Sequence, residues 1–268
     1  ICVLTIIGEC HLENLGDRDG VLKAKTEMFK NARKNADFIL NGDDDKLSTV
    51  KTVNGKKPVF FGLDAKNDFY AKNIKNSGDG KVLATLCFDN NDIDVEIPAI
   101  GTYMVTNALA AAAAGKLLGL TDEEIANGVA SYKTVGSRAN VIDTGKIKII
   151  DDCYNANPTS VRASLDTLSN LDGRKVAILG DMKELGSEEL KLHFDTGVYA
   201  KSKDIGTVIT VGELAKELAK GADGKAFDTI EDAKSEILKT IKSGDVVLVK
   251  ASHSMQFENI VEFLKQNF

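Results

Sequence analysis

Several features that define other classes of protein are missing from this 268-residue chain. No stretch reaches the roughly 18 consecutive apolar residues of a membrane-spanning helix, and no charged start precedes an apolar core. We therefore expect neither a transmembrane segment nor a signal peptide within it. The cysteines are scattered without metal-type spacing, which favours reduced, structural thiols in a cytoplasmic protein. They are Cys2, Cys10, Cys87 and Cys153.

An excess of basic charge is also absent. Lys and Arg number 34 against 40 Asp and Glu, giving a net charge of −6, which argues against a dedicated nucleic-acid-binding protein. The chain has no internal repeats and no low-complexity tracts. Its length allows two domains, and a hydrophobic content of 43% supports sizeable cores.

Two glycine-rich nucleotide motifs do not occur. The phosphate loop Gly-x-x-x-x-Gly-Lys-[Ser/Thr] is missing, and so is the Gly-x-Gly-x-x-Gly fingerprint of dinucleotide-binding domains. The second absence disfavours a nucleotide-dependent oxidoreductase.

The most informative segment that is present covers residues 149–160 (IIDDCYNANPTS). An apolar strand leads into two carboxylates and two carboxamides. Pro158 then opens a helix that Asn157 can cap. In open α/β sheets, ligands bind at the C-terminal ends of strands. The segment by itself is equally compatible with a ligand site and with an ordinary, well-capped loop.

A second block lies at residues 179–186 (LGDMKELG), with Leu192 and His193 downstream. Together the two blocks resemble the Mur ligase family, in the branch that adds D-alanyl-D-alanine to UDP-N-acetylmuramoyl-tripeptide. The resemblance runs in the same order over essentially the whole chain. It implies a cytoplasmic, monomeric, ATP- and Mg²⁺-dependent ligase of peptidoglycan precursor synthesis. In such a ligase, ATP converts a carboxylate to an acyl phosphate, which the amine then attacks.

The family also has an N-terminal domain for the UDP-sugar and a phosphate loop that opens the central domain. Neither is found in these 268 residues, and residues 1–7 (ICVLTII) already resemble a buried strand of a parallel sheet. We therefore expect an incomplete P-loop-type central ATPase domain over residues 1–136. A doubly wound, Rossmann-like C-terminal ligase domain is expected over residues 137–268. Such a fragment is expected to bind ATP weakly and not to ligate by itself.

Local patterning predicts the elements of both domains. In the first half we expect a polar loop at 8–20, a helix at 21–35, a strand at 36–40, short β-strands within 46–100, an Ala-rich helix within 101–119 and a helix that begins with a capping box at 121–124. In the second half we expect strands near 147–151, 175–180, 207–211 and 246–250, and helices near 158–170, 187–201, 212–220, 230–242 and 255–266. This alternation predicts a doubly wound parallel sheet.

The resemblance assigns catalytic and metal-binding roles to two residues of the first half. His11 follows the first strand, where an imidazole can bind a cation, and the resemblance implies a magnesium ligand. Lys25 has a match that carries a carbamate supporting a second magnesium ion. Without the resemblance, His11 would be an ordinary surface residue and Lys25 a solvated charge.

Further residues match the family's ATP site. The resemblance places Asn107 at the adenine, where an amide can donate and accept at once. It directs Arg138 to the phosphates, which the guanidinium fork suits. Asp152 is expected to accept from the ribose, while Asn155 and Asn157 belong to the same ATP-binding segment. Tyr103 and Met104 replace the His-Asn of many relatives.

The candidate substrate-binding residues follow the last predicted strand. The family usually has Lys-Gly-Ser-Arg, and here the sequence is Lys250, Ala251, Ser252 and His253. Replacing Arg by His weakens a bidentate hold on a substrate carboxylate and makes it depend on pH.

Other functions remain possible at the level of the sequence. Another ligase of the superfamily, such as folylpolyglutamate synthetase, would share the ATP residues, but the block at 179–186 disfavours it. A non-catalytic binding module or remnant would explain the missing phosphate loop. The reading frame upstream of Ile1 would discriminate between ligase and remnant. Whether the peptide substrate contains lysine or diaminopimelate does not follow from these residues.

Overall fold

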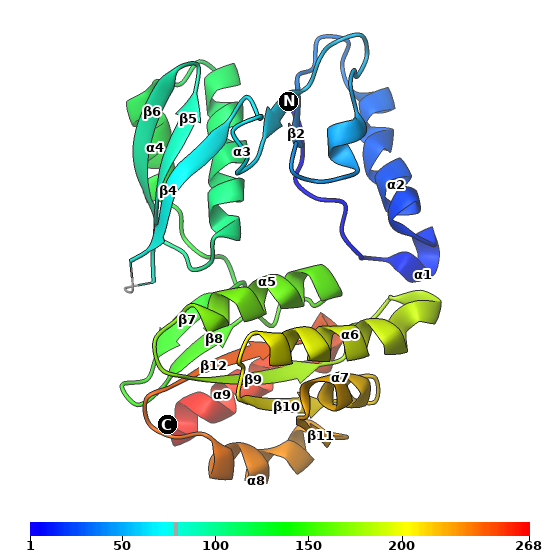
Figure 1. Ribbon diagram of the computed structural model, residues 1–268, viewed down its shortest axis with the longest axis vertical. Coiled ribbons are helices and arrows are strands. Elements are labelled where there is room, and N and C mark those ends of the chain that lie inside the picture. Colours follow the sequence, from blue (N-terminus) through cyan, green and yellow to red (C-terminus); the bar gives the residue numbers. More distant parts are fainter. Residues whose placement is uncertain (78–79) are drawn as a thin grey trace. The chain divides into compact units, whose positions relative to one another are not determined.

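The computed structural model describes residues 1–77 and 80–268 (Figure 1). The chain divides into two compact units, which are described separately below. The first consists of Ile1–Gly8 and Leu15–Lys133, and the second of Glu9–Asn14 and Thr134–Phe268. No helix in these described ranges is both long and apolar enough to cross a membrane.

A small parallel sheet forms one part of the first unit. Its strands are β1 (Cys2–Leu4), β2 (Phe38–Asn41) and β3 (Val59–Phe61), in that spatial order. Helix α2 (Arg18–Asn31) connects β1 to β2, and the short helix α1 (Leu12–Leu15) precedes it. The prediction of a buried strand over residues 1–7 was wrong in two respects. The strand covers only Cys2–Leu4. Ile1, Val3 and Ile6 are 47%, 36% and 42% exposed. Within the described chain, β1 pairs only with β2.

Helix α2 begins earlier than predicted. Residues 18–20 were assigned to a polar loop, but Oδ1 of Asp17 accepts hydrogen bonds from the backbone N–H groups of Asp19 and Gly20, both at 2.9 Å. This N-cap starts the helix at Arg18. The helix also ends at Asn31, four residues before the predicted end.

Of the short β-strands predicted within residues 46–100, β3 belongs to the parallel sheet, whereas β4 (Tyr70–Asn76), β5 (Val82–Phe88) and β6 (Asn91–Ile97) form an antiparallel sheet. The Ala-rich helix α3 (Tyr103–Leu117) packs against it, and α4 (Asp122–Ala130) follows. The predicted capping box of α4 is present, with Thr121 and Glu124 exchanging hydrogen bonds. Small side chains along α3 allow close packing, so its apolar surface joins both sheets in one core.

The second unit is built on a six-stranded sheet in the order β11-β10-β9-β12-β8-β7. Its strands are β7 (Asn140–Asp143), β8 (Lys148–Asp151), β9 (Arg174–Gly180), β10 (Thr207–Val211), β11 (Lys225–Phe227) and β12 (Asp245–Lys250). All neighbours are parallel except β7, which runs antiparallel to β8. The doubly wound, Rossmann-like architecture is thus confirmed. Only the short edge strands β7 and β11 were not predicted.

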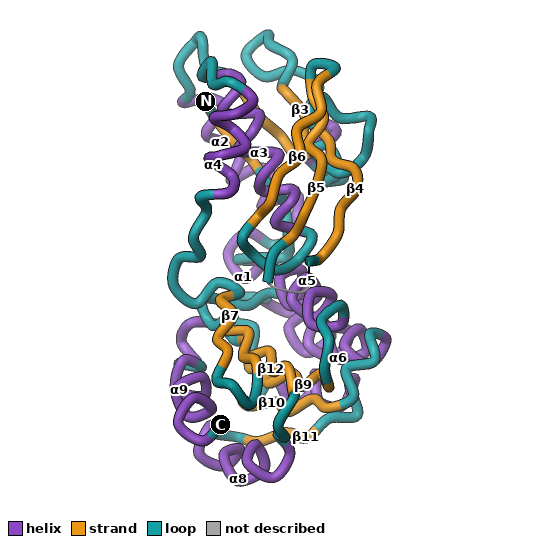
Figure 2. Tube along the Cα trace, turned by 90° about the vertical axis from the view of Figure 1, so that its left-hand side faces the viewer, coloured by secondary structure: helices purple, strands orange, loops and turns teal. Residues whose placement is uncertain are grey.

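Helices cover both faces of this sheet (Figure 2). On one side lie α5 (Pro158–Ser169), α6 (Glu189–Ser202) and α7 (Ala215–Ala222); on the other lie α8 (Ile230–Thr240) and α9 (Glu258–Asn267). The central strands are buried on both faces, as β12 shows with all of its residues buried. Parallel strands covered in this way leave their C-terminal ends as the accessible edge.

Candidate functional site

Three adjacent strands end at the same edge of the second sheet. β8 ends at Asp151, β12 at Lys250 and β9 at Gly180, and β12 lies between the other two. Because all three are parallel, the segments that follow them emerge side by side. Both sequence blocks and the segment 250–253 therefore meet at one place, the expected position of a ligand site in this architecture.

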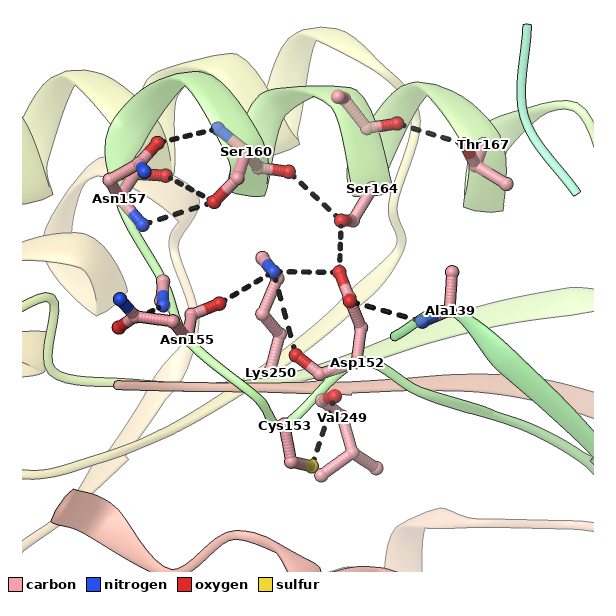
Figure 3. Close-up of polar contacts among 12 residues, drawn as sticks. Ala139, Asp152, Cys153, Asn155, Asn157, Ser160, Ser164, Thr167, Val249 and Lys250 are labelled. Carbon is pink, nitrogen blue, oxygen red and sulfur yellow. Dashed lines mark hydrogen bonds and ion pairs between the residues drawn. The ribbon is translucent and has the colours of Figure 1, made fainter. Parts of the chain in front are cut away.

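Lys250 lies beneath this edge rather than on it (Figure 3). Its side chain is only 3% exposed. The ammonium group donates to Oδ2 of Asp152 at 2.7 Å and to the backbone oxygen of Asn155 at 2.8 Å, and it lies 3.5 Å from the backbone oxygen of Asp152. These three acceptors occupy its donors. The structure therefore places Lys250, expected to bind substrate, as an internal brace of the loop after β8.

The carboxylate of Asp152 is held from three sides. Besides Lys250, the hydroxyl of Ser164 donates to Oδ2 at 2.7 Å and the backbone N–H of Ala139 donates to Oδ1 at 3.1 Å (Figure 3). Ser164 belongs to α5, so Asp152 connects that helix to the start of β7. Oδ1 retains acceptor capacity, as the ribose contact predicted for this residue requires.

The two asparagines of the segment differ in their roles. Asn157 caps α5: its Oδ1 accepts from the N–H of Ser160 at 2.8 Å, and the hydroxyl of Ser160 accepts from the N–H of Asn157 at 3.1 Å. The predicted cap is thus confirmed. Asn155 is exposed, and its Oδ1 accepts from the N–H of Ala156 at 2.8 Å. The side chain of Asn155 is therefore more accessible to a ligand than that of Asn157.

Three exposed side chains lie near one another at this edge. The guanidinium carbon of Arg138 lies 3.7 Å from the ring centroid of Tyr154. The ring of His253 lies 6.2 Å from the same ring. Arg138, Tyr154 and His253 are all exposed, so this group presents one permanent cation and one imidazole to a ligand.

The second sequence block is tied to the segment after β12. The N–H of Ser252 donates to the backbone oxygen of Asp181 at 3.0 Å, and the hydroxyl of Ser252 accepts from the N–H of Lys183 at 2.9 Å. Asp181 is 2% exposed and accepts from the N–H of Ala215 at 2.8 Å and from the ammonium of Lys183 at 2.7 Å. Sequence reasoning gave Asp181 no role. Its signal was a carboxylate placed directly after a buried strand.

The second residue of this block, Gly180, occupies a position where no side chain fits. A Cβ atom there would lie 2.5 Å from the ring of Phe257 and 2.7 Å from Cβ of Ala251. Such distances are well inside van der Waals contact, so only glycine lets the ends of β9 and β12 approach as they do. The methyl group of Ala251, where the family usually has glycine, adds to this crowding.

His193 supports the second block from α6. It is fully buried, and its Nε2 accepts a hydrogen bond from the N–H of Met182 at 2.9 Å. Nδ1 lies 2.6 Å from the backbone oxygen of Glu189. These partners assign the neutral tautomer with the proton on Nδ1, which donates to Glu189. Burial is the main reason why the pKa of His193 lies below its ordinary value.

We expect acid to destabilise the second unit through His193. A folded-state pKa below the unfolded value of about 6.5 means that the unfolded chain binds the proton more readily. The contribution of His193 is therefore complete above about pH 6.5 and declines as the pH falls towards the folded-state pKa. Urea unfolding between pH 8 and 5, roughly spanning that value, should show a smaller decline for His193→Gln than for the wild type. Equal pH profiles for the two proteins would contradict this prediction.

The three candidate residues of the first half of the sequence, His11, Lys25 and Asn107, do not belong to the strand ends described above. His11 lies in the segment Glu9–Asn14 of the second unit, and its Nδ1 contacts a carboxylate oxygen of Glu184 in the second block. Both residues have left-handed backbones, with φ of 56° and 64°. Glu184 was not predicted as a partner of His11.

Lys25 and Asn107 belong to the first unit. The ammonium of Lys25 donates to the backbone oxygen of Ile6 at 2.7 Å, beyond the end of β1. Asn107 lies in the second turn of α3, so it is not the N-cap. It borders a largely apolar cavity of about 370 Å³ between α3 and α4.

These residues do not assemble a complete metal site. Within residues 1–77 and 80–268, no group of three or more His, Cys, Asp and Glu side chains could hold a metal ion. A magnesium ion at His11 would need further oxygen ligands. His11 and Lys25 alone would therefore supply only part of a magnesium site.

Two family domains match the chain almost end to end. Residues 1–115 match the Mur ligase middle domain, and residues 137–253 match the Mur ligase, glutamate ligase domain. The chain belongs to the Mur ligase family. Among curated Mur ligases, it is 33% identical to the UDP-N-acetylmuramoyl-tripeptide–D-alanyl-D-alanine ligase of Bacillus subtilis strain 168, over 98% of this chain and 58% of that protein. The ligase of that name from Escherichia coli K12 is also 33% identical, over 97% and 59%.

Solved structures of Mur ligases agree with this membership. MurF from Acinetobacter baumannii superposes with a TM-score of 0.91 at 29% identity, covering 98% of this chain and 59% of that chain. MurF ligase from Thermotoga maritima, in complex with ADP, gives a TM-score of 0.88 at 27% identity, covering 99% and 62%. This Mur ligase chain thus spans about 58–62% of the length of these relatives.

Proposed function

We propose that this chain is part of an ATP-dependent carboxylate–amine ligase that joins D-alanyl-D-alanine to UDP-N-acetylmuramoyl-tripeptide. Two observations support the proposal. Both sequence blocks and the segment 250–253 converge on the ends of β8, β9 and β12, and the curated relatives that match the chain are named for this reaction.

In the proposed reaction, a carboxylate oxygen of the peptide attacks the γ-phosphorus of ATP, and ADP leaves. The amine of D-alanyl-D-alanine then attacks the acyl carbon, loses a proton, and phosphate leaves. The protein contributes positioning and neutralisation of charge. We assign the exposed guanidinium of Arg138 to the phosphate oxygens, the free acceptor capacity of Asp152 to the ribose, and Asn107 to the adenine. Asn155 and Asn157 shape the same segment.

For the amino substrate, we assign the surface beside Ser252 and His253. His253 is exposed and can meet a carboxylate, whereas Lys250 acts from below through the loop. Magnesium supplies charge neutralisation when bound, and His11 and a carbamylated Lys25 are the residues that would support it. We also propose a cytoplasmic monomer, consistent with four free cysteines.

We expect Lys25→Ala to lower turnover by roughly 10- to 100-fold, the usual cost of removing a group that supports a metal ligand sphere. If a carbamate is the active form, small carboxylates such as acetate should restore part of the rate. Lys23→Ala, at an exposed lysine of the same helix, is the matched control. Unchanged turnover of Lys25→Ala would show that this lysine is only a surface charge.

The decisive experiment uses the protein expressed from its own complete gene. Incubated with ATP, magnesium, UDP-N-acetylmuramoyl-tripeptide and D-alanyl-D-alanine, it should release phosphate and form the extended peptide in equal amounts. Omitting the dipeptide should stop steady release. Absence of amide formation with all substrates present would refute the proposed function.

The fold of folylpolyglutamate synthetase from L. casei is also similar, at 19% identity, but that likeness shows the fold alone.

A further inference from the structure

The guanidinium of Arg138, which we assign to the phosphates, packs against the ring of Tyr154. None of the hydrogen bonds found among residues 1–77 and 80–268 uses its guanidinium, which is exposed. An unrestrained arginine loses much side-chain entropy when it binds a ligand. The stack on Tyr154, with 3.7 Å between guanidinium carbon and ring centroid, restricts it in advance.

The backbone around Arg138 is clamped on both sides. The N–H of Tyr154 donates to the backbone oxygen of Ser137 at 3.0 Å, and the N–H of Ala139 donates to Oδ1 of Asp152 at 3.1 Å. Segment 137–139 is thereby fixed against segment 152–154, and Arg138 lies between the two hydrogen bonds. These two main-chain hydrogen bonds therefore help to hold the guanidinium against the ring, in addition to the attraction between the two groups.

Ala139 adds a sign of local strain. Its φ is +53°, in the left-handed region that non-glycine residues rarely adopt. Such a conformation persists only where the surrounding structure enforces it, as the bond to Asp152 does here. The strained residue directly follows Arg138 in the chain.

The geometry of the stack leaves the arginine chemically available. At 3.7 Å between the guanidinium carbon and the ring centroid the two planar groups must lie face to face, because an edge-on guanidinium would bring a nitrogen inside van der Waals contact with the ring. The N–H donors lie in the guanidinium plane and point outward from its edge. A phosphate binds through those edge donors. The ring and an anion can therefore hold the same guanidinium at once.

We propose that Tyr154 is a positioning residue: it holds the Arg138 guanidinium face-on and so presents its donor edge to an anionic phosphate oxygen. This inference rests on the proposed function. It concerns a residue to which neither the sequence blocks nor the resemblance gave a role.

The test compares Tyr154→Leu with Tyr154→Phe in the protein expressed from its complete gene. Loss of an exposed cation–π contact predicts an ATP dissociation constant and a KM for ATP about two- to fivefold higher in Tyr154→Leu. Tyr154→Phe keeps the ring and should restore wild-type values. The KM for D-alanyl-D-alanine and the unfolding temperature should change little in either variant, because Tyr154 is 51% exposed. Wild-type affinity in Tyr154→Leu would overturn the proposal.

A double-mutant cycle with Arg138→Ala separates positioning from direct contact. Tyr154→Leu should have no further effect on ATP binding in the Arg138→Ala background. A persisting effect would show that the ring contacts the ligand itself and would overturn the positioning role.

A readout without ATP keeps this inference distinct from the proposed function. NMR relaxation of the Arg138 Nε–Hε group should show a more mobile side chain in Tyr154→Leu than in the wild type and in Tyr154→Phe. Equal mobility in all three proteins would overturn the proposal even if ligation is demonstrated. A failure of ligation with restricted mobility would refute the function while leaving the stack intact.

Discussion

Lys250→Met is expected to lower the free energy of unfolding of the second unit by about 3–5 kcal/mol, the cost of removing one partner of a buried ion pair. Lys250 and Asp152 are 3% and 14% exposed, so methionine would leave the carboxylate without its partner and with little water to replace it. The backbone oxygen of Asn155 would also lose its donor.

Urea unfolding followed by hydrogen exchange at the amides of β8 and β12 measures this change and assigns it to the second unit. Lys220→Met is the matched control, because that lysine is 64% exposed and pairs with Glu217 at the surface. Combining Lys250→Met with Asp152→Asn should recover part of the loss, since the unpaired charge is removed. A loss no greater than that of the control would show that the pair is not a brace.

Arg138→Ala is expected to lower the rate of ligation by roughly 10²- to 10³-fold, as removal of one preorganised donor from a developing charge usually does. The guanidinium is exposed and bonds to no other described side chain through its donors, so its removal should leave the fold intact. Arg138→Lys keeps the positive charge but loses the planar donor fork and the planar group that stacks on Tyr154. Its rate of ligation is expected to lie between those of the wild type and Arg138→Ala.

Steady-state assays of the protein expressed from its complete gene measure this effect, with thermal unfolding as the check on folding. Arg33→Ala, at an exposed arginine of the first unit, serves as the control. Wild-type turnover in Arg138→Ala would remove this residue from the reaction. It would leave the family membership of the chain untouched.

Features that depend on neighbouring residues followed from the sequence. The capping box at Thr121 and the cap at Asn157 each join residues three positions apart, so the pattern that encodes them is local. The alternation of strands and helices over the second half predicted the doubly wound sheet because hydrophobic periodicity reports burial directly. Strands β7 and β11 escaped prediction because each is short and lies at an edge, where fewer residues need to be apolar.

The sequence by itself determined the family, the kind of sheet and the strand ends from which a site would be built. Only the tertiary structure decided what the side chains there do. Lys250 contacts residues 95 and 98 positions away, and the stack of Arg138 on Tyr154 joins two separate segments. Burial determines whether a lysine binds a ligand or braces a loop, and burial of a single side chain depends on every element packed around it. A motif gives the type of residue at a position, whereas its partners are set by the fold.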